Sequence, residues 1–201
     1  FPIESLHRNF SAAIKASGRD MVLEVVAGYF FLGDDIRMYA NVWRFCEDHH
    51  DSWESTTEQL LCRHLLKKGA AGSAGGWASM DLMTTGGQGC SVDGAVVDHC
   101  PGQTDDEYMT EFVLWCLTQS PLLVATDVRN LTSSMSSLML NSELLSIHQS
   151  TATPPGKLLG HWLCTDPLDC EIWGRPLTAD GDEWLVALIN RGDKSNHSIS
   201  C

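Results

Sequence analysis

The sequence predicts an α/β fold with a parallel sheet, followed by the beginning of an antiparallel β domain. Along residues 1–154, segments typical of strands and segments typical of helices alternate four times. This order is characteristic of parallel strands joined by helical crossovers. After Pro154-Pro155 the pattern changes to strands separated by turns. We therefore expect two domains, residues 1–154 and residues 155–201.

Apolar spacing and capping residues locate the helices. Asp34 and Asp35 can cap a short helix, and Ser52 precedes a longer one. Thr104-Asp105-Asp106-Glu107 is a capping box, and the apolar residues behind it have the spacing of a core-facing helix. The predicted helices are residues 5–17, 36–40, Ser52 to Lys67-Lys68-Gly69, the segment after Glu107, and 133–148.

The strands are marked by β-branched and apolar runs between turn residues. In the first domain we expect buried strands at 21–26 and 121–127, with further strands at 42–45 and 78–83. In the second domain, Asp180-Gly181-Asp182 indicates a hairpin. The strands expected there are residues 157–163, 170–177 and 183–190.

Composition narrows the classes of partner and compartment. The formal charge of −13 argues against a nucleic-acid partner, and no apolar stretch is long enough for a membrane helix. Cys90 with Cys100 and Cys164 with Cys170 are close pairs that suit disulfides, and there are three glycosylation sequons at Asn9, Asn130 and Asn196. Together they favour an oxidising, secretory compartment, with free thiols in a reducing compartment as the alternative.

The segment Trp43-Arg44-Phe45-Cys46-Glu47-Asp48-His49-His50-Asp51-Ser52-Trp53 concentrates polar chemistry. Tryptophans beside carboxylates and an arginine suit a pocket that stacks a sugar face, although a solvated strand-to-helix loop has the same composition. Asp48, Asp81 and Asp127 all lie at or just past the ends of expected strands. In parallel barrels such positions carry site residues. Asp127 has the alternative of a helix cap, and Arg44 that of a simple ion pair with Asp48 or Asp51.

Two other chemistries fit the segment less well. His49 and His50 lie beside carboxylates, but adjacent histidines in an extended segment point apart and neither spacing is that of a metal motif. Cys46 has no recognisable base or oxyanion hole for a thiol nucleophile. We therefore predict neither a metal nor a cofactor.

An ordered series of motifs gives a specific resemblance. Its members are Trp43-Arg44 with Asp48 and Asp51-Ser52-Trp53, Gly75-Gly76-Trp77 with Asp81, residues 104–115, Pro121-Leu122-Leu123 with Asp127-Val128-Arg129, Leu144-Leu145-Ser146-Ile147-His148-Gln149, and Glu171-Ile172-Trp173-Gly174-Arg175-Pro176-Leu177. The chain resembles the C-terminal half of family 27 glycoside hydrolases, the α-galactosidases and α-N-acetylgalactosaminidases.

This resemblance implies the second half of a (β/α)8 barrel, followed by the start of a β-sandwich. It implies a retaining α-galactosidase, secreted or lysosomal/vacuolar, whose partner is a carbohydrate and whose oligomeric state is open. Asp48 would be the general acid/base, and Arg44, Asp81 and Trp77 would bind the sugar. The nucleophilic aspartate is expected upstream of residue 1, so residues 1–201 alone should be inactive. The alternatives are a non-catalytic sugar-binding protein and activity on another α-glycoside, such as an α-N-acetylgalactosaminide.

The chain departs from the family pattern at several positions. Ala78-Ser79-Met80 replaces Asn-Asp-Pro before Asp81, and Val26 stands where a residue usually contacts the second carbon of the sugar. Glu24 is two residues early, and we expect it to face the other way. The family's disulfide positions hold Val25 and Ala40. Finally, Trp43, Trp53 and Trp77 as pocket walls should raise the pKa of Asp48, and Arg44 should oppose that shift.

Overall fold

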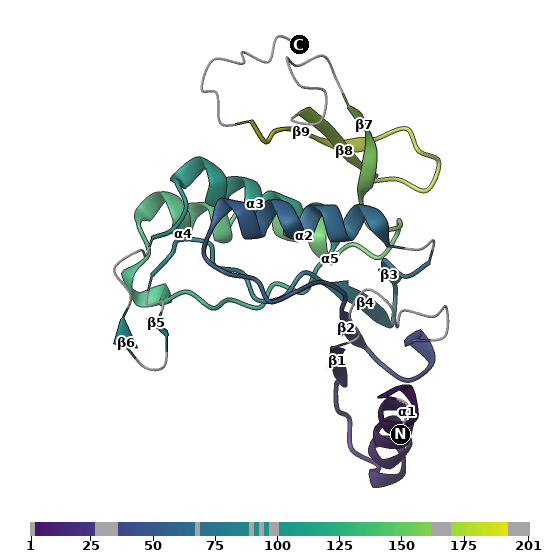
Figure 1. The fold of residues 1–201 in the computed structure, drawn as a ribbon. Coiled ribbons are helices and arrows are strands. Elements are labelled where there is room, and N and C mark those ends of the chain that lie inside the picture. Colours follow the sequence, from purple (N-terminus) through teal and green to yellow (C-terminus); the bar gives the residue numbers. More distant parts are fainter. Residues whose placement is uncertain are drawn as a thin grey trace.

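The computed structural model of this chain describes residues 3–26, 36–66, 69–88, 91–92, 95–96, 101–161 and 170–192. A parallel sheet lies under a layer of helices, and an antiparallel sheet lies on the other side of those helices (Figure 1). The predicted Asp34/Asp35 cap, the Lys67-Lys68 helix end and the residues Cys90, Cys100, Cys164 and Asn196 fall outside the described residues.

The first sheet confirms that three of the four strands expected before residue 154 run parallel. Its order is β1-β2-β4-β3, with β1 at Glu24–Val26, β2 at Val42–Arg44 and β4 at Gly76–Ser79 all parallel. The short β3, Gly72–Ser73, pairs antiparallel with β4. Met83 and Val124 form one further parallel bridge beyond β4. The carboxyl ends of β2 and β4 therefore lie side by side.

Most of the predicted helices form, with caps where the sequence placed them. The described helical elements are α1 (Ile3–Ser17), the 3-10 turn η1 (Ile36–Met38), α2 (Trp53–Leu65), α3 (Asp105–Thr118), the 3-10 turn η2 (Val128–Asn130), which was not predicted, α4 (Ser133–Met139) and α5 (Ser142–Gln149). The Ser52 side chain accepts from Ser55 N at the start of α2. Thr104 and Glu107 close a complete capping box on α3.

The core has two parts on opposite sides of α2 and α3. Val25, Trp43 and Ala78 are paired in register, so they share one sheet face, and this face packs on α3 through Phe112 and Trp115. On the other side, apolar residues of α2 and α3 pack against the antiparallel sheet. This second cluster contains Leu60, Leu114, Leu117, Trp173 and Ile189. The helical layer is thus buried on both sides.

The three strands of the second sheet are antiparallel, as predicted. They are β7 (Lys157–His161), β8 (Cys170–Pro176) and β9 (Trp184–Asn190), in the order β7-β8-β9. Gly181 in the connection between β8 and β9 has φ +80°, a left-handed conformation that glycine adopts without strain. A separate short hairpin joins β5 (Ser91–Val92) to β6 (Ala95–Val96).

Three expectations about single elements were wrong. The segment 121–127 forms only the Met83–Val124 bridge and leaves Leu123 and Val124 exposed, because no described strand pairs with its other edge. In β1 only Val25 is buried, since the face opposite the helices is uncovered in the described part of the chain. The predicted helix 133–148 is two helices, because the Asn141 side chain accepts from Glu143 N and Leu144 N and starts α5.

Candidate active site

Arg44 is the centre of a charged cluster at the carboxyl end of the parallel sheet. It is the last residue of β2, and its Nη2 atom lies 2.5 Å from Asp48 Oδ1 and 3.0 Å from Asp81 Oδ2. Asp48 follows β2 by four residues, and Asp81 follows β4 by two. Because β2 and β4 are neighbouring parallel strands, these two acids meet at one guanidinium. The structure thus brings together three of the four predicted site residues.

The three side chains differ strongly in exposure. The Asp48 side chain is 75% exposed, whereas those of Arg44 and Asp81 are 17% and 14% exposed. The hydrogen bond from Arg44, and then its positive charge, hold the pKa of the Asp48 carboxyl below its usual range. The Arg44 effect on the pKa of Asp48 therefore outweighs the effect expected of the tryptophans, because the guanidinium contacts Asp48 and the Asp48 side chain is mostly exposed.

The tryptophans have different roles from one another. Trp43 is fully buried on the helix-facing side of the sheet, and its Nε1 donates to Ala70 O at 2.8 Å. It is therefore core and not a pocket wall. Trp77 is half-buried, pairs in register with Val42 and lies on the same sheet face as Arg44. It stands two residues before the strand end, so the structure leaves it upstream of the Arg44 cluster.

Asp81 is held in place from several directions. Its Oδ1 accepts from Leu82 N at 2.8 Å, and its Oδ2 accepts from His49 N at 3.0 Å. Trp115 Nε1 donates to the Asp81 carbonyl at 3.2 Å. The φ angle of Asp81 is +74°, which is uncommon for a residue other than glycine. Strained residues of this kind gather at functional sites.

Glu24 lies on the Arg44 face of the sheet, contrary to the expectation that it would face the other way. Residues two apart in a strand share a face, so Glu24 points to the same side as Val26 and Arg44. Partial burial and the nearby Asp81 charge raise the pKa of Glu24, and Arg44 acts in the opposite direction. Because side chains alternate between the two faces of a strand, the position of Glu24 two residues before Val26 is sufficient to predict that it lies on the Arg44 face.

Asp51 and Asp127 have structural partners. Asp51 accepts from the Tyr108 hydroxyl at 2.6 Å and from Gly102 N at 3.0 Å, and this pairing with Asp51, after burial, raises the pKa of Tyr108. Asp127 caps η2, and the Arg129 guanidinium lowers the pKa of Asp127 to about 2. The helix-cap alternative for Asp127 is therefore confirmed.

One disulfide joins two cysteines that their spacing in the sequence did not pair. Cys46, two residues before Asp48, is bonded to Cys62 of α2. Burial raises the pKa of the free Cys116 thiol to about 12. Cys170 is also disulfide-bonded, but the predicted Cys164–Cys170 and Cys90–Cys100 pairings stay predictions. Residues 46 and 62 come together only because the loop after β2 folds back along α2.

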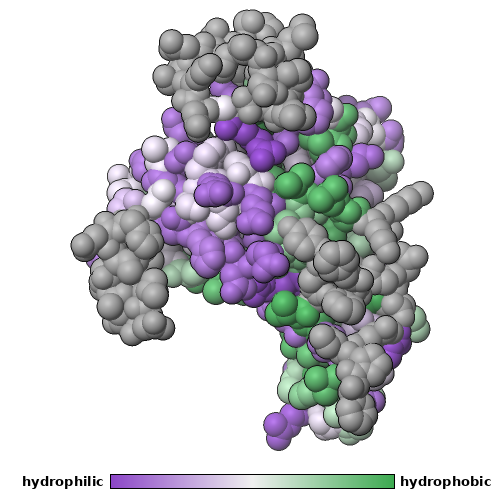
Figure 2. Space-filling model, viewed as in Figure 1, coloured by the Kyte–Doolittle hydropathy of each residue, from purple (hydrophilic) through white to green (hydrophobic). Residues whose placement is uncertain are grey.

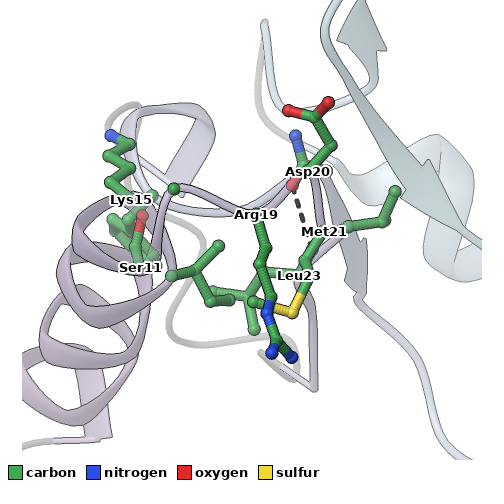
Figure 3. A pocket seen from close by; sticks show the side chains of 11 residues that line it. Ser11, Lys15, Arg19, Asp20, Met21 and Leu23 are labelled. Carbon is green, nitrogen blue, oxygen red and sulfur yellow. Dashed lines mark hydrogen bonds between the residues drawn. The ribbon is translucent and has the colours of Figure 1, made fainter.

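The structure describes no competing site. Within the described ranges, no group of three metal-ligating side chains occurs. Among the helices that it describes, none has the length and apolar character needed to cross a membrane. A cavity of about 570 Å³ lies between α1 and residues 18–23, with Tyr39 and Asn41 also lining it, and Arg44 is not part of its lining. Figure 3 shows Lys15, Arg19 and Asp20 at its rim pointing apart, so their charges do not converge on one ligand.

Comparisons with known proteins place these residues in a family context. The family model described as "Alpha galactosidase A" matches residues 3–150. Alpha-galactosidase 3 of Arabidopsis thaliana is 31% identical over 163 residues, which are 79% of this chain and 33% of that protein. Human alpha-galactosidase A is 27% identical over 193 residues, which are 92% of this chain and 40% of that protein.

One solved structure extends the similarity to the fold. A family 27 β-L-arabinopyranosidase of Geobacillus stearothermophilus, in complex with arabinose, matches with a TM-score of 0.72 at 26% identity. The match covers 92% of this chain and 41% of that one. This chain therefore spans about a third to two fifths of the length of the curated relatives that it matches.

Proposed function

This chain belongs to the alpha-galactosidase A family of glycoside hydrolases, and we propose that it carries the acid/base half of a retaining α-galactosidase site. The observation that supports the proposal is the Arg44 guanidinium bridging Asp48 and Asp81 at the ends of two adjacent parallel strands. We assign residues 1–154 to the second half of a (β/α)8 barrel. Residues 155–201 would begin a β-sandwich domain.

Asp48 is the proposed general acid and base. It is the most exposed member of the cluster, so a glycosidic oxygen can reach it without movement of the core. In a retaining mechanism this carboxyl first protonates the leaving oxygen and later activates water. Its ion pair with Arg44 keeps it ionised, which suits the second step. For the first step, the Arg44–Asp48 hydrogen bond has to weaken as the sugar binds.

Arg44 and Asp81 are the proposed ligands of the sugar hydroxyls. Arg44 presents donors and Asp81 presents acceptors, so the pair can bind neighbouring hydroxyl groups from one side of a ring. When a hydroxyl accepts from Arg44, that hydroxyl replaces Asp48 as its partner, and the pKa of Asp48 then rises toward the value that an acid needs. Trp77 is proposed as an apolar contact on the same sheet face.

The nucleophile is proposed to come from a residue before residue 1. A retaining enzyme needs a second carboxylate about 5 Å from the acid/base, on the other side of the anomeric carbon. Asp81 does not suit this role, because it contacts the same guanidinium as Asp48. The uncovered sheet face suits such a contribution, because Val26, which shares that face with Arg44, is exposed there. Figure 2 shows hydrophobic surface in the lower part of the molecule, over α1 and β1.

We propose a secretory location because the chain contains disulfides. Cys46–Cys62 joins two described segments, and bonds of this kind persist in oxidising compartments. Asn9 and Asn130, the two sequon residues within the described ranges, are both exposed. This agrees with a secreted or lysosomal/vacuolar glycoprotein.

The Asp48→Asn variant of the complete natural protein tests the function. Asparagine cannot donate or accept the catalytic proton, so we expect hydrolysis of an aryl α-galactoside to fall about 10²- to 10⁴-fold. Asp106→Asn, an exposed acid at the start of α3, is the matched control and should retain wild-type turnover. Wild-type turnover in Asp48→Asn contradicts the proposal.

A sugar-binding protein without catalysis is the second candidate. The Ala78-Ser79-Met80 segment before Asp81 favours it, because the side chains usual in the family are absent there. Calorimetry with galactose separates the two candidates. Binding that is lost in Arg44→Met, together with no turnover in the wild-type protein, would support this candidate.

A further inference from the structure

A fully buried histidine–glutamate contact lies directly behind the candidate site. The side chains of His49 and Glu111 are both 0% exposed, and Nε2 lies 3.0 Å from Oε1. His49 is the residue after Asp48, and Glu111 lies in the middle of α3. The contact therefore joins the loop that carries the proposed acid/base to the most deeply buried helix.

The hydrogen bonds around this pair show how its polar atoms are partnered. Glu111 Oε1 also accepts from Thr84 N at 2.7 Å, and Oε2 accepts from the Thr85 hydroxyl at 2.9 Å. Since Glu111 accepts in these contacts, His49 Nε2 is the donor. The Ser55 hydroxyl accepts from His50 N and lies 3.0 Å from His49 Nδ1, so both ring nitrogens of His49 have a hydrogen-bond partner.

The same residue reaches the site through its backbone. His49 N donates to Asp81 Oδ2, so the loop and the second acid are directly connected. The His49 ring centroid lies 5.2 Å from the ring of Trp115, whose Nε1 binds the Asp81 carbonyl. His49 thus connects both acids to α3, because Asp48 is its neighbour in the chain and Asp81 accepts from its backbone N–H.

The geometry points to His49 and Glu111 as positioning residues that fix Asp48 against Asp81 during glycoside hydrolysis. The inference rests on the proposed function. Asp48 is exposed and lies on a loop, so Arg44 is the only described side chain in hydrogen-bond contact with it, and the next residue must fix the direction of the chain. Glu111 supplies this anchor from a helix, and Thr84 and Thr85 complete it.

Two substitutions of His49 separate positioning from bulk. His49→Gln keeps an N–H donor toward Glu111, whereas His49→Leu removes it. In the complete natural protein with an aryl α-galactoside, we expect His49→Leu to lower kcat about 10- to 100-fold, since small misplacements of reacting groups cost this much. KM should change less than about threefold, and His49→Gln should stay within about threefold of wild-type kcat. His64→Leu on the exposed part of α2 is the matched control.

The inference fails if His49→Leu keeps wild-type kcat, or if His49→Gln is as damaging as His49→Leu. An NMR titration of the Asp48 carboxyl carbon supplies a readout that needs no turnover. The Arg44 contact keeps this pKa low, so in His49→Leu it should rise toward the ordinary aspartate value. An unchanged Asp48 titration in folded His49→Leu overturns the inference, whereas an inactive wild-type protein overturns only the proposed function.

Discussion

At the residue scale, single carboxylates in this chain are distinguished by their donors. Among the described residues, Asp48 forms an ion pair with Arg44 and is open to solvent, whereas Asp81 contacts Arg44, His49 and Leu82. The first arrangement suits proton transfer, and the second suits a fixed acceptor. Asp127 is different again, because its donors come from the turn that it caps.

Asp127 makes a testable contribution to stability that depends on pH. Its folded pKa of about 2 lies below the ordinary value of 3.8, so its contribution is complete above pH 3.8 and is lost as the pH falls through about 2. Asn in Asp127→Asn can still cap η2 but carries no charge. Urea unfolding should show this variant less stable than wild type at pH 6, with the two curves converging near pH 2. A difference independent of pH would contradict the assignment.

At the element scale, the loop after β2 is fixed to helices at both ends. Cys46 bonds covalently to α2, His49 contacts α3, and Asp51 accepts from Tyr108. The helices themselves are held on both faces by the two sheets. A loop with charged, exposed side chains can therefore keep one conformation.

The disulfide should be a measurable part of this restraint. Cys46 and Cys62 are separated by 16 residues, and cross-linking a loop of this size is worth about 3 kcal/mol. Cys62→Ser should therefore lower the free energy of unfolding by about this amount in guanidinium chloride under oxidising conditions. Adding a reductant provides the control, since wild type and variant should then unfold alike. Equal stability without reductant would exclude this role.

At the scale of the whole molecule, Arg175 joins the antiparallel sheet to the helical layer. It is fully buried in β8 and donates to the carbonyls of Ile147, Ser150 and Thr153. Burial lowers the pKa of Arg175. These carbonyls include ones at the end of α5, where a positive charge is favoured.

Arg175→Met should loosen both layers at once. Methionine fills similar space without donors, and leaving the buried carbonyls unpaired should cost roughly 3–5 kcal/mol. Hydrogen exchange should then accelerate in β8 and at the end of α5 together. Arg129→Met is the control, because this arginine lies in η2, its side chain is 85% exposed, and exposed ion pairs contribute little to stability. Faster exchange confined to β8 would contradict a joining role.

The sequence by itself determined the features that depend on near neighbours. Capping residues predict the helix starts at Ser52 and Thr104. Local spacing likewise predicts the parallel and antiparallel character of the two halves and the pairing of Arg44 with Asp48. These interactions span a few residues, so periodicity and cap chemistry suffice to identify them.

The tertiary structure alone decided which distant residues meet. Asp81 reaches Arg44 through strand pairing, Glu111 reaches His49 from 62 residues away, and Cys46 finds Cys62 through the fold of a loop. The exposure of segment 121–127 depended in the same way on which strands pair with it. Contacts of this kind depend on the sheet order and on the packing of helices over it, and no local pattern in the chain encodes either.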